Sequence, residues 1–127
     1  MTWKIANPNE DTLQEVNSLK QLLSILELYN HNFSNSPQLI EIISPTNKTL
    51  VIGIGGELSY LNYMDENAWP AFSSIGDLNM SGFLEFTMNG DYTEIPSIYG
   101  IPYKNAIKAV EEFYNDTKPV CIKWEEN

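Results

Sequence analysis

The chain has 127 residues, 43% of them apolar, a size and composition that suit one domain, 1–127, with no membrane-spanning segment. Seventeen Asp and Glu residues stand against seven lysines and no arginine, which gives a net charge of −10. Phosphates repel such a chain, and arginine is the usual bidentate donor to phosphates and bases, so nucleic acid is excluded as a partner.

Residues 11–29 are predicted as the first helix, because apolar side chains recur there at steps of three and four. Thr12-x-x-Glu15 has the form of a capping box, with Asp11 as an alternative cap. The stretch 30–37 is rich in Asn and Ser, includes a proline, and is predicted as a loop.

Two β-branched runs, 39–44 and 49–54, are separated by a short polar link and predict a hairpin. The second run ends in Val51-Ile-Gly-Ile-Gly-Gly56, which resembles a glycine-rich phosphate loop. A dinucleotide fingerprint needs a helix after the glycines, whereas residues 57–64 continue as an alternating strand. The glycines therefore predict a sharp turn or bulge.

Residues 65–81 contain a tryptophan, a proline and a glycine and are predicted as irregular. Two further strands, 83–88 and 91–95, flank Asn89-Gly90, which is one of the strongest short hairpin signals.

The last third of the chain predicts a helix and a strand. Pro102 suits the first turn of a helix, whose apolar stripe runs from Tyr103 to Tyr114. Lys118-Pro119 ends that stretch, and 120–124 alternates as a final strand. The order helix, five strands, helix, strand favours an α+β fold: a mainly antiparallel sheet of about five to six strands, packed on one face by two helices.

Few residues suit catalysis or metal binding. His31, the one histidine, has neither a nucleophile nor a carboxylate beside it in the sequence. A metal would have to rely on carboxylates, and no Asp-rich stretch has calcium-loop spacing. Cys121 is expected as a small buried residue in a reducing compartment. The polar N-terminus has no basic start and no apolar core of a signal peptide, and together with the single cysteine and the lack of a membrane span this points to the cytoplasm. We expect no cofactor.

One pair of carboxylates conflicts with the predicted hairpin. If Asn89 and Gly90 form its loop, Glu85 lies directly opposite Glu94, an unfavourable pairing of like charges. In a dry site one of the two carboxyls would have a raised pKa and could serve as an acid. The alternatives are a binding role for the pair and a merely solvated face.

Aromatic and acidic residues gather in and beside the irregular segment. Tyr and Trp are common interface anchors, and acids beside them suit a basic partner. The alternatives are that Trp69 closes the edge of the core and that the acidity only keeps the chain soluble. The candidate binding residues are Tyr60, Tyr63, Asp65, Glu66, Trp69 and Asp77, with Glu85 and Glu94 added from the hairpin.

The C-terminal half, with the glycine-rich strand and turn at 50–61, resembles the Imm1 immunity proteins over residues 39–126. The pattern that carries the resemblance is Glu94-Ile-Pro96, Ile101-Pro102, Ala106-Ile107-x-Ala109, Phe113, Lys118-Pro119 and Trp124. Family members often have a glycine near the end of the second helix, where this chain has Asn115-Asp116-Thr117. This departure affects the end of the helix more than function.

The resemblance implies an antitoxin of a bacterial polymorphic toxin system. Such a protein binds a toxin domain encoded by the adjacent gene, often a nucleic-acid deaminase and sometimes a nuclease. We therefore expect the acidic chain, as a monomer or homodimer when free, to occlude the active site or substrate cleft of a basic toxin. Phe113, Pro119 and Trp124 would belong to the core. The alternatives are a small α+β enzyme that uses Glu85 and Glu94, and an adaptor with a small-molecule pocket.

Overall fold

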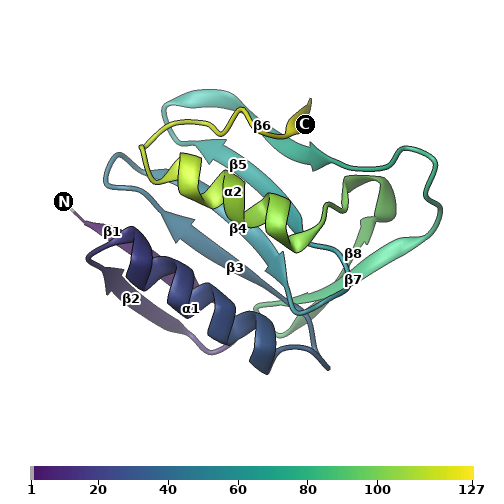
Figure 1. The fold of residues 1–127 in the computed structure, drawn as a ribbon, viewed down its shortest axis with the longest axis horizontal. Helices are drawn as coiled ribbons and strands as arrows, with labels where there is room; N and C mark the ends of the chain where they lie inside the picture. Colours follow the sequence, from purple (N-terminus) through teal and green to yellow (C-terminus); the bar gives the residue numbers. More distant parts are fainter. Residues whose placement is uncertain (1) are drawn as a thin grey trace.

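The computed structural model describes residues 2–127, which form an α+β fold of nine strands and two α-helices (Figure 1). The elements are β1 (Trp3–Asn7), β2 (Thr12–Val16), α1 (Leu19–Asn32), β3 (Gln38–Ile43), β4 (Lys48–Ile54), β5 (Tyr60–Asp65), β6 (Ala68–Ile75), β7 (Phe83–Met88), β8 (Asp91–Pro96), a 3-10 turn (Ser97–Tyr99), α2 (Tyr103–Phe113) and β9 (Lys123–Glu126). The prediction of five to six strands, and the predicted element order, are therefore wrong. Within residues 2–127 no helix is long and apolar enough to cross a membrane.

All nine strands belong to one sheet, whose main path is β2-β1-β3-β4-β5-β6-β9, with every neighbouring pair antiparallel. The β7–β8 hairpin lies off this path and joins it through a single parallel pair, Gln38 with Thr87. Figure 1 shows α1 and α2 side by side on one face of the sheet, as predicted. The opposite face carries the hairpin.

The helix predicted at 11–29 begins at residue 19 instead. Residues 12–16 are strand β2, which pairs with β1 after a tight turn, so Thr12 and Glu15 are not a helix cap. The cap is Ser18, whose side chain accepts a hydrogen bond from the Gln21 N–H, while Gln21 Oε1 accepts one from the Asn17 N–H. The Ser-x-x-Gln box competes with the Thr-x-x-Glu box upstream of it, and tertiary pairing with β1 decides between them.

The segment predicted as irregular contains strand β6. Pro70 lies within it, at the point where the pairing with β5 shifts register between Tyr63 and Asp65. Proline is tolerated in a strand at such irregularities because no regular ladder bond is lost there. The final strand also lies further along than predicted, because β9 occupies 123–126 and pairs with β6.

The main core lies between the helices and the sheet. Leu22 and Leu26 of α1 meet Leu50, Ile52 and Ile54 of β4, and none of these five side chains has measurable exposure. From α2 the core receives Ala106, Ala109, Val110 and Phe113. The apolar stripes predicted for both helices thus do face the sheet, at positions three and four residues apart.

A second, smaller core lies under the β7–β8 hairpin and contains Leu39, Val51, Tyr60 and Phe86. The Phe86 ring packs directly on Gly53, since a Cβ at that glycine would lie 2.7 Å from two ring carbons. The glycine-rich stretch therefore serves packing as well as the predicted turn. Gly55, just after β4, has φ +98°, a conformation that glycine adopts at little cost.

We expect Phe86→Ala to lower the free energy of unfolding by about 3–5 kcal/mol, because it leaves a cavity in the smaller core. Urea unfolding at neutral pH measures the loss. Phe83→Ala, in the same strand but 61% exposed, is the matched control and should change stability by less than about 0.5 kcal/mol. Equal losses from the two variants would show that the hairpin is not held by Phe86.

Candidate functional site

Two of the predicted binding residues lie in the cores. Tyr60 belongs to the small core under the hairpin, and its hydroxyl is hydrogen-bonded to Ser73 at 2.9 Å. Tyr63 belongs to the main core, where its ring meets Phe113 edge-on. Burial, followed by the charges of Asp65 and Asp116, raises the pKa of Tyr63. Neither ring is presented to a partner.

Trp69 is instead 87% exposed, so it does not close the edge of the core. It borders an open groove of about 430 Å³ at the turn between β5 and β6, which we call the Trp69 groove. The groove is lined by Ile43, Asn47, Thr49, Met64, Asp65, Glu66, Ala68, Trp69 and Ala71. The structure thus brings together three of the predicted site residues: Asp65, Glu66 and Trp69.

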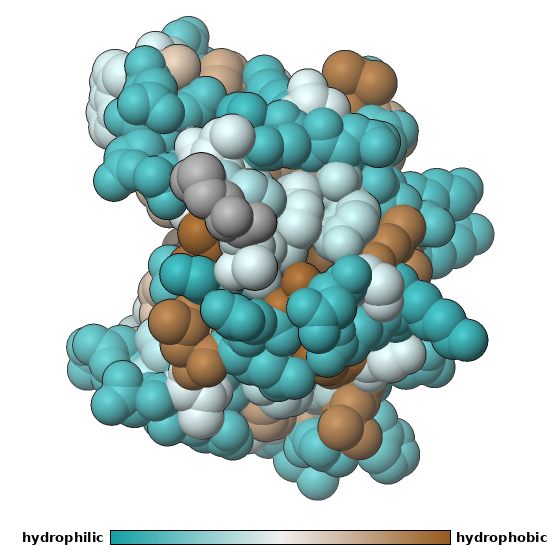
Figure 2. Space-filling model, turned by 90° about the vertical axis from the view of Figure 1, so that its left-hand side faces the viewer, coloured by the Kyte–Doolittle hydropathy of each residue, from teal (hydrophilic) through white to brown (hydrophobic). Residues whose placement is uncertain are grey.

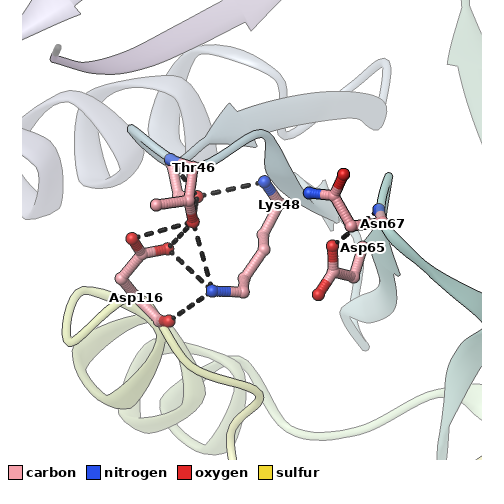
Figure 3. A network of polar contacts seen from close by, with 6 residues as sticks. Thr46, Lys48, Asp65, Asn67 and Asp116 are labelled. Atoms are coloured by element: carbon pink, nitrogen blue, oxygen red, sulfur yellow. Dashed lines mark hydrogen bonds and ion pairs between the residues drawn. The ribbon is translucent and has the colours of Figure 1, made fainter.

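The two acids of this groove belong to the tight turn between β5 and β6. Asp65 Oδ1 accepts a hydrogen bond from the Asn67 N–H at 2.9 Å (Figure 3), so the carboxylate also shapes the turn. Glu66 is exposed. Figure 2 views the end of the molecule that lies at the left of Figure 1, where a mostly hydrophilic surface is interrupted by separate hydrophobic residues.

Asp77 lies apart from this groove, in a second hollow of about 380 Å³ that Cys121 also lines. Its carboxylate caps a turn by accepting a hydrogen bond from the Asn79 N–H. Cys121 is exposed, so the prediction of a buried cysteine is wrong. Partial burial of the thiol, followed by the nearby Glu112 carboxylate, raises the pKa of Cys121.

Glu85 and Glu94 are paired directly across the β7–β8 hairpin, which confirms the predicted register. Both are exposed on its outer face, beside a third hollow of about 400 Å³ that Glu85, Phe83 and Tyr92 help to line. A hydrogen bond from the Tyr92 hydroxyl to Glu85 raises the pKa of Tyr92. Because both side chains are exposed, this differs from the dry site in which a carboxylate acid is favoured.

The negative charge is unevenly distributed over the fold. Helices α1 and α2 carry three lysines and three glutamates, so the helical layer is neutral. The whole excess of −10 therefore belongs to the strands and their connections. Among residues 2–127, no three His, Cys, Asp or Glu side chains are grouped in a way that would hold a metal ion.

Sequence reasoning missed a polar tether beside the Trp69 groove (Figure 3). Thr46 donates to both carboxylate oxygens of Asp116 at 2.8 and 2.9 Å, and Lys48 Nζ donates to the Asp116 carbonyl at 2.8 Å. Lys48 also forms an ion pair with the carboxylate at 3.4 Å. The tether joins the β3–β4 turn to the segment after α2.

Asp116 adopts φ +62°, a conformation that favours glycine. It lies in the stretch 115–117, which resembles the place where Imm1 proteins often have a glycine but contains none in this chain. That difference is the one feature of the sequence that points to the tether. Partial burial by itself raises the pKa of this carboxyl, but hydrogen bonds from Ser44 and Thr46 and the charge of Lys48 outweigh it. The pKa of Asp116 is therefore lowered from its ordinary value of 3.8.

An exposed tryptophan beside an open, mostly apolar groove on an acidic chain is typical of the class of small proteins that bind other proteins. The chain belongs to the Imm1 family, because the family model described as Immunity protein Imm1 matches residues 11–126. This confirms the resemblance and extends it toward the N-terminus. A comparison with curated proteins finds no match. By its family the chain is an immunity protein, which implies a toxin as its partner.

We expect Asp116→Asn to lower the free energy of unfolding at neutral pH by about 1 kcal/mol, because Asn tolerates positive φ but lacks the charge. Because the pKa of the Asp116 carboxyl is lowered in the folded state, its charge stabilises the fold at pH values above 3.8. This contribution disappears as the pH falls through the pKa of the folded state.

Urea unfolding of both proteins over a series of pH values measures this difference. The two proteins should become equally stable well below pH 3.8. The control Glu111→Gln removes the same charge at an exposed site on α2. Its difference in stability from the parent chain should not change with pH in this way. A gap between Asp116→Asn and the parent chain that persists in acid would contradict an ionic tether.

Proposed function

We propose that this chain neutralises a basic toxin domain that acts on nucleic acid, as a deaminase or a nuclease, and that is encoded by the adjacent gene. The chain binds that domain in the cytoplasm and occludes its active site or substrate cleft. It acts by excluding the substrate rather than by chemistry of its own. Family membership supports the toxin partner, and charge supports the mode of binding.

The observation that carries this proposal is the segregation of charge. An enzyme that binds nucleic acid presents a basic cleft. The neutral helical layer leaves the whole excess of −10 on the rest of the chain. Such a field accelerates the encounter with a basic cleft and competes with phosphate for it. The contacts we propose come from the acids Asp65, Glu66, Asp77, Glu85 and Glu94, with Trp69 as an aromatic anchor.

The alternative of a carboxylate enzyme gains less support. Glu85 and Glu94 are opposite one another, as an acid/base pair could be, but both are exposed on the outside of a hairpin. General acid catalysis at neutral pH relies on a desolvated carboxyl. The pair suits attraction of a cationic side chain better than proton transfer.

Co-expression tests the function directly. Bacteria that express the toxin domain of the adjacent gene should grow only when this chain is present, and the purified chain should bind that domain with nanomolar-class affinity. The variant Glu85→Gln/Glu94→Gln distinguishes the two functions. It should still protect, with at most a modest loss of affinity. Loss of protection by a variant that binds the toxin domain normally would favour an enzyme instead.

Neutralising Asp65, Glu66 and Asp77 as Asp65→Asn/Glu66→Gln/Asp77→Asn should slow association with the toxin domain and flatten its dependence on salt. The amide replacements keep the two turn-capping hydrogen bonds of the aspartates. The matched control, Glu10→Gln/Glu27→Gln/Glu111→Gln, changes the net charge equally at exposed sites elsewhere. Stopped-flow association rates at several salt concentrations provide the measurement. Equal slowing by both triple variants would mean that only net charge matters.

A further inference from the structure

Residues 2–127 leave one half of a sheet face uncovered. The helices cover one face, and the β7–β8 hairpin covers the other only around Leu39, Val51 and Tyr60. Side chains alternate across a sheet, so residues next to main-core positions point to the opposite face. Because Tyr63 and Phe72 pack in the main core, Met64 and Ala71 point away from the helices.

The register places these residues in a continuous row on the uncovered half. Ile43 of β3 pairs with Thr49 of β4, and Thr49 pairs with Met64 of β5. Ala71 and Trp69 of β6 extend the row to the floor and border of the Trp69 groove. The groove is thus built on strands β3 to β6 together with the turns that join them.

Two polar residues, Asn62 and Ser73, lie between the groove and the core under the hairpin. Along the next register line, Val51 pairs with Asn62, and Asn62 pairs with Ser73. The Asn62 amide donates to Ser73 Oγ at 3.2 Å and to Asn127 Oδ1 at 2.9 Å. Because these two residues are satisfied by their own hydrogen bonds, the groove is a surface distinct from the core and not an extension of it.

The groove exposes large apolar side chains, whereas a sheet face that only meets solvent usually carries polar ones. Trp69 is 87% exposed and Met64 37% exposed. An apolar patch rimmed by polar residues on a soluble protein marks a surface for another molecule, and tryptophan is among the residues most enriched at binding hot spots. Methionine adds an adaptable apolar contact.

Charge decides which molecule this is. A second copy docked groove to groove by a two-fold axis would bring Asp65 and Glu66 against their own counterparts, with −10 on each chain. The chain's seven lysines are also far outnumbered by its seventeen Asp and Glu residues, so a second copy offers little positive charge to Trp69. A basic partner meets neither obstacle, since a guanidinium or ammonium group is attracted both to the acids and to the face of the indole.

We propose that the Trp69 groove is the central docking surface for the toxin domain, which inserts an apolar side chain against Met64 and Ala71. An adjacent arginine or lysine of the toxin lies over Trp69 and faces Asp65 and Glu66. This proposal rests on the proposed function. It adds which face of the sheet binds the toxin domain, that Trp69 is the anchor residue, and that a cationic side chain of the toxin contacts it. The neutral helical layer faces away from the toxin.

Two variants test the groove, each with a matched control. Trp69→Ala removes the anchor, and Tyr92→Ala removes an aromatic ring that is 65% exposed on the hairpin. Met64→Lys places a cation in the groove, and Val120→Lys adds the same charge at a site that is 85% exposed elsewhere. Urea unfolding confirms that all four remain folded, and titration calorimetry with the purified toxin domain of the adjacent gene gives the Kd.

We expect Trp69→Ala and Met64→Lys to raise the Kd at least about 30-fold, while the two controls change it less than about threefold. If the parent chain binds the toxin domain and the groove variants bind as tightly, the groove proposal fails and the proposed function stands. A loss confined to Tyr92→Ala moves the surface to the hairpin and overturns the groove proposal too.

Two further outcomes concern the occupant of the groove. If light scattering shows that the free chain is a dimer that Trp69→Ala dissociates, the groove binds a second copy, and the proposal of a toxin contact there is overturned. If the parent chain neither binds the toxin domain nor protects against it, the proposed function itself fails. The groove proposal then fails with it.

Discussion

Strand β4 is the constraint on which the rest of the structure depends, because it is buried on both faces from Leu50 to Ile54. Leu50, Ile52 and Ile54 face the helices, and Val51 and Gly53 face the hairpin. A strand in this position accepts almost no polar side chain, and one side of it must be small where Phe86 approaches. The apolar, glycine-containing run at 49–54 is therefore a structural necessity that resembles a ligand loop only by composition.

Burial of β4 on both faces also determines where the molecule stays open. The small core ends at the row of Asn62 and Ser73, whose polar groups bond to one another and to the C-terminal Asn127. Beyond that row nothing in residues 2–127 covers Met64 and Trp69. The boundary between core and groove thus lies at Asn62 and Ser73. A shift of one residue in the pairing of β5 would turn its core side chains toward the groove and its groove side chains toward the core.

Local sequence signals predict an element correctly where tertiary contacts do not override them. Asn89-Gly90 specifies a two-residue loop, and this local signal is enough to place Glu85 opposite Glu94. The helix predicted at 11–29 extends too far because Leu13 and Val16 fit a helical stripe and an alternating strand equally, and only pairing with β1 decides. For the site, the exposure of Trp69 and the burial of Tyr60 depend on which sheet face stays open, a tertiary fact without a local signal.

The residues that carry the family pattern hold the scaffold rather than the groove. Phe113 is buried in the main core, the Trp124 indole N–H donates to the Pro119 carbonyl, and Lys118 lies over the Phe72 ring. All three pin α2 and the C-terminal segment to the sheet, on the side away from Met64 and Trp69. Such a division lets the groove and its acids change without loss of the fold. Because discrimination between partners is a difference of affinities, side chains at this surface can match one toxin and reject another while the core is preserved.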